Sequence, residues 1–280
     1  MTGASANFWD KLQAIDRRIL YLLLLIVVIA PLFLPISLPT VTMPSTQRLY
    51  DAIESIPPGG FVIVSATWSG GTRAENMPQT VAILRHAMQR GLRVAVFSFD
   101  VQGSQLSLDI AKRLAAEYGY EYGKNWVHWG FRPQVGVVMK SMVRDIPGTF
   151  DKDYQGKPTK DMPMMQGIKN IQNVDAIVEI AASGIYADWI GLVVGANPKL
   201  KFGFCPTSVM VPETYPYLAS GQIVGTMEGM RGAAEYERLL KKPGLATVGM
   251  GSISLAHVLI MLLIVIGNIG YFATRARRSR

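Results

Sequence analysis

The residues whose chemistry is most suggestive follow the first predicted strand, at Trp68, Ser69, Gly70, Gly71, Thr72 and Arg73. Glycines allow backbone amides to approach an anion, the hydroxyls and the guanidinium donate hydrogen bonds, and the indole ring offers a stacking face. This pattern indicates a loop that binds a phosphate or carboxylate. The alternative is a flexible loop followed by a helix cap, which a glycine pair without further glycines at fixed spacing favours.

Three other candidate ligand-binding residues follow later strands: Asp100, Ser183 and Thr207. In an open parallel sheet, ligands bind beyond the carboxyl ends of the strands, where loops from neighbouring strands meet. We therefore expect these residues at the same edge of the sheet as the loop 68–73. Asp100 has an equal alternative role as the cap of a helix that starts near Ser104.

Two reactive side chains lie inside predicted strands. Glu179 belongs to the apolar run 176–181, where a charge is costly unless it is paired, so either it faces a cavity or its strand is at a sheet edge. Cys205, the single cysteine, ends another strand and is more typical of a small buried apolar residue than of a reactive thiol. The spacing gives no support to a pair between Cys205 and His86 or His128, and no G-x-S-x-G motif occurs.

The sequence predicts no metal site and no cofactor. Its three histidines, His86, His128 and His257, lack ligand-like spacing. The segment 151–156 begins like a calcium-binding loop, but Met162 stands where the bidentate glutamate would be, so we interpret the segment as a turn. Neither of the two glycine-rich nucleotide-binding motifs is present.

The candidate residues are positioned by an alternation of predicted strands and helices. After a short helix from an N-cap at Ser45 to Pro57, apolar strand-like runs alternate with amphipathic segments. Nearly continuous apolar strands separated by helices indicate a parallel sheet covered on both faces. We expect an α/β fold, a parallel-sheet Rossmann-like domain. The predicted strands are 61–66, 93–99, 176–181, 200–205 and one near 223–224, and the predicted helices are 80–89, 106–118, 186–194 and 232–240.

The stretch from Glu121 to Gln172 is less regular. Residues 126–131 have strand character, and residues 135–143 suit either a strand or a helix. Residues 147–163 form a long excursion rich in glycine, proline, aspartate and lysine. Loops of this length in a compact domain are usually functional or mobile.

Two segments are apolar enough to cross a membrane. The chain of 280 residues is 49% hydrophobic and only 17% charged, and the excess lies in Ile19–Leu38 and Ile253–Phe272. About twenty residues without a formal charge span a hydrocarbon core of about 30 Å as a helix. We interpret the first as a retained anchor, because its flank lacks the small-x-small site of a cleaved signal peptide.

Charges beside these segments predict the topology. Lys11, Arg17 and Arg18 precede the first helix and four arginines follow the second, and short positive flanks stay in the cytoplasm. The prediction is a two-pass protein of the cell (inner) membrane with both termini cytoplasmic. Its parts are a cytoplasmic flank at 1–18, transmembrane helix 19–38, an extracytoplasmic α/β domain at 39–252, transmembrane helix 253–272 and a basic cytoplasmic tail at 273–280.

The net charge of +8 is concentrated outside the middle domain. Without the flanks, 21 basic and 18 acidic residues remain, a balance of +3. This lacks the concentrated basic face of a nucleic-acid-binding protein, so no nucleic-acid partner is expected. The tail Arg275–Arg280 suits the anionic headgroups of a lipid bilayer.

Two resemblances accompany this pattern. Residues 216–225 (PYLASGQIVG) and 229–237 (GMRGAAEYE) resemble the closing part of a type I periplasmic-binding-protein lobe, where a strand carrying Gly-Gln leads into a Gly/Ala-rich helix. The middle segment is too short for two full lobes. The whole pattern also resembles a prokaryotic family of two-helix membrane proteins with one Rossmann-like middle domain. Neither resemblance implies a site residue.

Two functions fit the sequence. Because a catalytic signature is missing, we favour a scaffold or ligand-binding module that assembles as a membrane-bound homo-oligomer, with adaptable contacts from Met162, Met164, Met165, Met227 and Met230. The alternative is a membrane-tethered enzyme that acts on a phosphorylated or carboxylated envelope metabolite at the loop 68–73 and Asp100.

Overall fold

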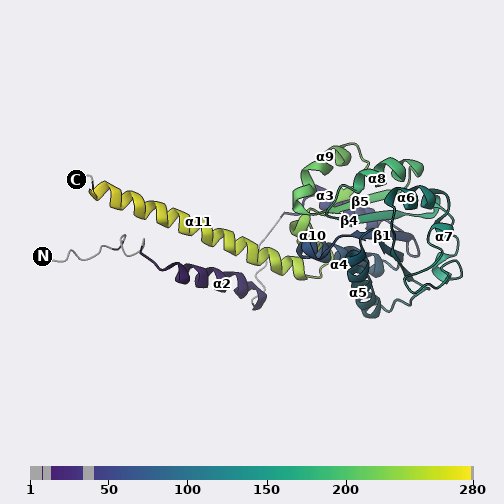
Figure 1. Cartoon of the computed structure of the whole chain (residues 1–280), viewed down its shortest axis with the longest axis horizontal. Helices are drawn as coiled ribbons and strands as arrows, with labels where there is room; N and C mark the ends of the chain where they lie inside the picture. Colours follow the sequence, from purple (N-terminus) through teal and green to yellow (C-terminus); the bar gives the residue numbers. More distant parts are fainter. Residues whose placement is uncertain (1–7, 9–13, 34–40, 279–280) are drawn as a thin grey trace. The chain divides into compact units, whose positions relative to one another are not determined.

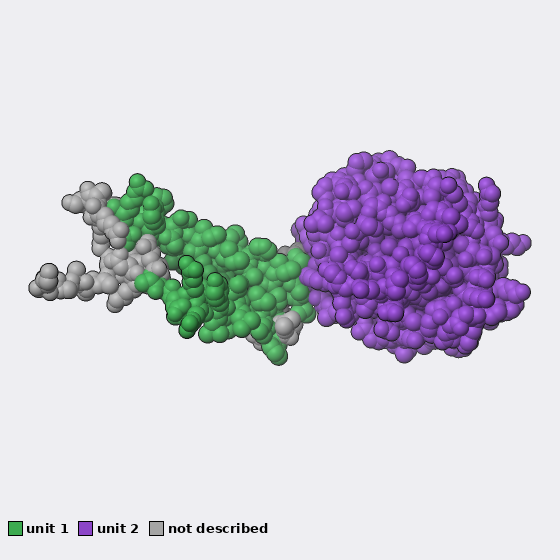
Figure 2. Space-filling view, in the orientation of Figure 1, with its two compact units in different colours: residues 1–39, 248–280 green, residues 40–247 purple. Residues whose placement is uncertain are grey.

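The computed structural model describes residue 8, residues 14–33 and residues 41–278. The chain divides into two compact units (Figure 2). One combines Met1–Pro39 with Val248–Arg280, and the other is Thr40–Thr247. The second unit holds the whole β-sheet and every candidate ligand-binding residue (Figure 1).

The second unit is built on a six-stranded parallel sheet in the order β3-β2-β1-β4-β5-β6. This order is that of Rossmann-like domains, with the topological switch point between β1 and β4. The expected α/β class and parallel sheet are confirmed. The strands are β1 (Phe61–Thr67), β2 (Arg93–Ser98), β3 (Trp126–Phe131), β4 (Ala176–Ala181), β5 (Lys201–Pro206) and β6 (Gly225–Thr226).

Helices cover both faces of the sheet (Figure 1). Helix α4 (Arg73–Gln89) packs against α5 (Val101–Tyr118) and α10 (Gly229–Leu239), and α10 also packs against α3 (Pro44–Glu54). Helix α6 (Val135–Arg144) packs against α7 (Ile146–Thr149) and α8 (Tyr186–Leu192). The crossovers from β1 through α4 and α5 run toward one edge of the sheet, and the crossover from β4 through α8 runs toward the other. Because both are right-handed, their helices lie on opposite faces. Helix α9 is Val211–Ala219, and the short 3₁₀ turns are Gly70–Thr72, Pro163–Met165, Ile171–Asn173, Val194–Ala196 and Ser208–Met210.

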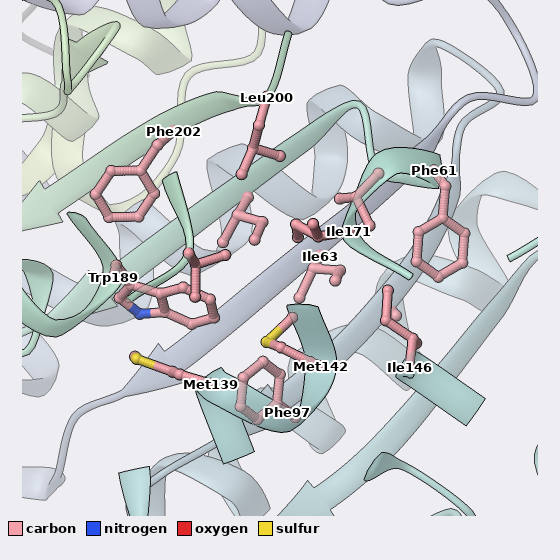
Figure 3. Packing of buried hydrophobic residues seen from close by; sticks show 14 of the residues in the cluster. Phe61, Ile63, Phe97, Met139, Met142, Ile146, Ile171, Trp189, Leu200 and Phe202 are labelled. Atoms are coloured by element: carbon pink, nitrogen blue, oxygen red, sulfur yellow. The ribbon is translucent and has the colours of Figure 1, made fainter. Parts of the chain in front are cut away.

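The core under α6 and α8 is rich in aromatic and methionine side chains (Figure 3). The Trp189 indole from α8 packs against Phe97 of β2 and Phe202 of β5, and Met139 and Met142 of α6 are fully buried. Met164 and Met165 are also buried in this cluster. These two methionines therefore fill the core of the domain and present no surface for contacts between subunits.

Helices α4 and α5 begin earlier in the chain than the sequence predicts. Helix α4 begins seven residues before the expected Thr80, and α5 begins at Val101 instead of Leu106. Pro44 occupies the first turn of α3, so the N-cap is Met43 and the expected cap at Ser45 is wrong. Residues 135–144 form a helix, which decides between the two structures that the sequence allowed there.

The first unit contains two apolar helices. Helix α11 (Leu245–Arg278) includes the expected segment 253–272, and its part Leu245–Arg275 is long and apolar enough to cross a membrane. Helix α2 (Arg17–Phe33) has 17 residues and exposes Ile19, Leu25 and Phe33. Residues 34–38 of the first expected membrane helix lie outside the described residues. Among the described residues, α11 is the one helix that is both long and apolar enough to cross a membrane.

Candidate functional site

Trp68 and Arg73 line a pocket between α4 and α5, near the carboxyl end of β1. Its volume is about 230 Å³. The floor is apolar, because Trp68 and Ile110 are buried and Met77 and Leu106 are half-buried. The charged side chains of Arg73, Asp109 and Arg113 are exposed at the rim.

The floor of this pocket is held rigid by one buried hydrogen bond. Trp68 is 2% exposed, and its indole N–H donates to the Thr80 hydroxyl over 3.1 Å. Thr80 in turn donates to the carbonyl of Asn76, one turn earlier in α4. The indole N–H is therefore satisfied within the protein, and its ring face contributes apolar surface.

The two arginines at the rim have no ion-pair partner among the described residues. The Arg73 Nε donates only to the Met77 sulfur, over 3.3 Å. Glu117, one helical turn from Arg113, pairs instead with Arg85 at 3.4 Å. Two guanidinium groups are thus free to bind an anion next to an apolar floor.

Several hydrogen-bond donors of the β1–α4 loop are already bonded to acceptors within the protein. The Gly70 amide donates to the Gln102 side chain over 2.9 Å, and the Thr72 amide and hydroxyl both donate to the Ser69 carbonyl. Gly71 is exposed within the 3₁₀ turn. The loop therefore bonds to α5 and continues directly into α4, and the Gly70 amide is not free for an anion.

Asp100 has the geometry of a helix cap. Its carboxylate accepts a 2.8 Å hydrogen bond from the Gly103 amide at the start of α5, which is the arrangement that stabilises an N-terminus. Of its two alternative roles, the structure shows the cap. Asp100 does not line the Trp68 pocket.

Ser183 and Thr207 follow β4 and β5, but neither lines the pocket between α4 and α5. Ser183 is exposed and Thr207 is buried. Next to Thr207, the Ser208 amide and hydroxyl donate to Glu75 of α4 over 2.7 and 2.6 Å. The loop after β5 is therefore tied to α4.

Glu179 is fully buried on the central strand β4, so of its two alternatives the sheet edge is wrong. One carboxyl oxygen accepts a 2.6 Å hydrogen bond from the Trp189 indole. The other has no hydrogen-bond partner of good geometry among the described residues, although the hydroxyls of Ser65 and Thr67 lower the pKa to a smaller extent. Burial raises the pKa of Glu179 to about 8, so the side chain is mostly protonated at pH 7.

His128 is next to Ser107 but does not activate it. Its Nδ1 accepts from the Gly130 amide over 3.0 Å, so Nε2 carries the proton and donates to the Ser107 oxygen 3.1 Å away. Burial lowers the pKa of His128 to about 3, which keeps the ring neutral. The pair is a structural hydrogen bond on the face of β3 covered by α5.

The remaining candidates are structural as well. Cys205 is completely buried, and burial raises the pKa of its thiol, which opposes formation of a reactive thiolate. The Asp153 carboxylate accepts from the amides of Gln155 and Lys157, both over 2.8 Å, in the turn that begins like a calcium loop. No group of three His, Cys, Asp or Glu side chains in the described part of the chain could hold a metal ion.

Sequence reasoning missed the residues that α5 contributes to the pocket. These follow a helical spacing of three, four and seven positions, which places them on one face: Leu106, Asp109, Ile110 and Arg113. That spacing was a usable signal within α5. It could not show that this face lies opposite Trp68 and Arg73.

Comparison with known proteins gives no further guide, because no protein family, no curated protein and no solved structure matches this chain.

Proposed function

We propose that this protein is a membrane-anchored ligand-binding protein that binds a small molecule with an anionic group and a compact apolar body. The observation that carries this proposal is the pocket in which the unpaired arginines Arg73 and Arg113 lie at the rim of an apolar floor formed by Trp68 and Ile110. A guanidinium pair binds carboxylates and phosphates through charge-assisted hydrogen bonds. The floor supports an aromatic or branched aliphatic group.

The size and charge of the pocket limit the range of ligands that it can bind. A volume of about 230 Å³ suits a compact molecule with one ring or one branched chain. Asp109 at the rim repels a second negative charge close to the first. A monoanion therefore fits better than a nucleotide with several phosphates.

The membrane arrangement is the second part of the proposal. In it, α2 and α11 are both anchors, the two termini are cytoplasmic and the domain is extracytoplasmic. The apolar surface of α2 and the arginines that begin α2 and end α11 support this topology. The anchors associate in a homo-oligomer, and the Arg275–Arg280 tail contacts anionic lipid headgroups.

The ligand proposal is tested with phenyl phosphate, benzoate and the neutral benzyl alcohol as probes on the full chain in detergent. We expect the monoanion benzoate to bind most tightly, phenyl phosphate, which carries about two negative charges at pH 7, to bind more weakly, and the alcohol not to bind. Arg73→Ala and Arg113→Ala each remove one charge-assisted bond and should weaken anion binding about tenfold or more. The measurement is calorimetric titration.

Arg48→Ala is the matched control, because Arg48 is exposed on α3 and does not line the pocket. Equal binding by wild type and both pocket variants would disprove the site. The enzyme alternative would use the same pocket, and it predicts that phenyl phosphate is consumed during the titration.

A further inference from the structure

One buried carboxylate binds the segment through which the chain leaves the α/β unit. Glu237 of α10 is 2% exposed. It accepts from the amides of Gly244, Ala246 and Thr247 over 2.9, 3.1 and 2.9 Å, and from the Thr247 hydroxyl over 2.6 Å. These donors belong to the first turn of α11 and the residue before it. Glu237 thus supplies from another helix the cap that α11 needs.

The chain enters the same unit beside the same helix. Glu235 of α10, which is 1% exposed, accepts a 2.9 Å hydrogen bond from the amide of Met43, the N-cap of α3. Its second oxygen accepts from Arg231 over 2.9 Å. The Ser45 hydroxyl donates to Glu228, immediately before α10, over 2.9 Å.

We infer that α10 acts as a carboxylate clamp, formed by Glu228, Glu235 and Glu237, that holds the incoming segment 43–47 and the outgoing segment 244–247 as one cooperative unit. A buried carboxylate is costly unless it is fully hydrogen-bonded, so the two buried glutamates strongly favour the bonded state of both segments. If each glutamate were only a local cap, the two segments would open independently. Because α10 and its N-cap residue carry all three groups, release of one segment loosens the other.

Helix α10 is in turn fixed to α4. The Gln79 side chain donates to the carbonyls of Met227 and Gly229 over 2.8 and 3.3 Å, and the His86 ring bonds the Tyr236 hydroxyl over 2.7 Å. Tyr236 lies between the two buried glutamates of the clamp. The clamp is therefore continuous with the helix whose first turns line the Trp68 pocket, although it does not depend on ligand binding.

The test uses Glu237→Gln in the full chain, reconstituted in lipid nanodiscs, with amide hydrogen exchange as the readout. Loss of the carboxylate should speed exchange of residues 244–247 about tenfold or more, because hydrogen bonds to charged groups are stronger than neutral ones. The distinctive result is at residues 43–47, which Glu237 does not touch. The clamp requires at least about threefold faster exchange there too.

Two further variants make the outcome decisive. Asp100→Ala, which removes the cap of α5, should speed exchange at residues 101–104 and leave both clamped segments unchanged. If Glu237→Gln unfolds the domain, Thr247→Val is used in its place. This variant removes one of the four hydrogen bonds to Glu237 and should speed exchange in both segments, 43–47 and 244–247, to a smaller degree. Faster exchange confined to residues 244–247 in either variant would overturn the clamp.

Discussion

At the scale of single residues, the decisive feature is the cost of burying a polar group. Glu179 lies on the central strand under the Trp189 ring, and burial raises its pKa to about 8. The folded protein therefore holds a proton on Glu179 at pH values where the unfolded chain has lost it. Between about pH 4.5 and pH 8 the folded state binds more protons, so this residue's contribution to stability declines as the pH rises through that window.

Glu179→Gln should remove this pH dependence. Glutamine has the same shape and cannot ionise. As the pH rises through this window, we therefore expect the free energy of unfolding of the variant to increase relative to that of the wild type by about 1.4 kcal/mol per pH unit. Urea unfolding of the full chain, followed by tryptophan fluorescence at several pH values, measures the difference. Glu117→Gln, at the surface of α5, is the control for the same chemical change outside the core. A constant difference between Glu179→Gln and the wild type would show that Glu179 is not held as the neutral acid.

At the scale of elements, the close approach of α5 to β1 decides which residues the chain tolerates. A Cβ atom at Gly103 would lie 2.6 Å from the carbonyl oxygen of Trp68 and would also clash with the carbonyl oxygen of Ala66. Both are backbone atoms that cannot move without displacing the end of β1. This glycine therefore allows α5 to approach the strand that leads into the pocket.

Gly103→Ala should consequently destabilise the domain by about 1–3 kcal/mol, the usual cost of overpacking, despite the better helix propensity of alanine. Thermal unfolding of the two variants measures the change. Gly136→Ala in α6 is the matched control, because a Cβ there meets no atom within 4 Å. We expect Gly136→Ala to be neutral or slightly stabilising. An unchanged melting temperature for Gly103→Ala would mean that α5 can shift away from β1 at little cost.

At the scale of the whole molecule, the proposed topology places the α/β unit on the extracytoplasmic side of the membrane. The single native cysteine, Cys205, is buried, so an added surface cysteine is a unique label. Asp153 is 6% exposed and its carboxylate is engaged in a turn, whereas Lys160 in the same excursion is exposed.

Lys160→Cys should therefore react with a membrane-impermeant maleimide added to intact cells, because the positive flanks predict an extracytoplasmic domain. Ser279→Cys, in the basic tail, is the counterpart and should react only after the cells are opened. Labelling of the two variants is compared by gel shift. The reverse pattern would place the domain in the cytoplasm.

Local pattern alone determined the strands, the class of the fold and the apolar character of α11. Phe61–Ala66 and Ala176–Ala181 are short apolar runs between turn residues, and such runs form buried strands whatever their partners are. The sequence also placed Trp68 and Arg73 beyond the carboxyl end of β1, because β1 must end before Gly70. It could not decide the role of Asp100, which depends on the start of α5.

Only the tertiary structure decided which faces meet. Helical spacing puts Asp109 and Arg113 on one side of α5, but packing against α4 brings them to Arg73 and Trp68. From the sequence, Glu179 is a charged residue in an apolar strand without a known partner. The structure shows that β4 is central and that the Trp189 indole donates a hydrogen bond to this carboxyl group. Glu235 and Met43 are 192 positions apart, and no local periodicity links them. The physical reason is that periodicity specifies the direction of a side chain relative to its own backbone, whereas its partner depends on packing between elements distant in sequence.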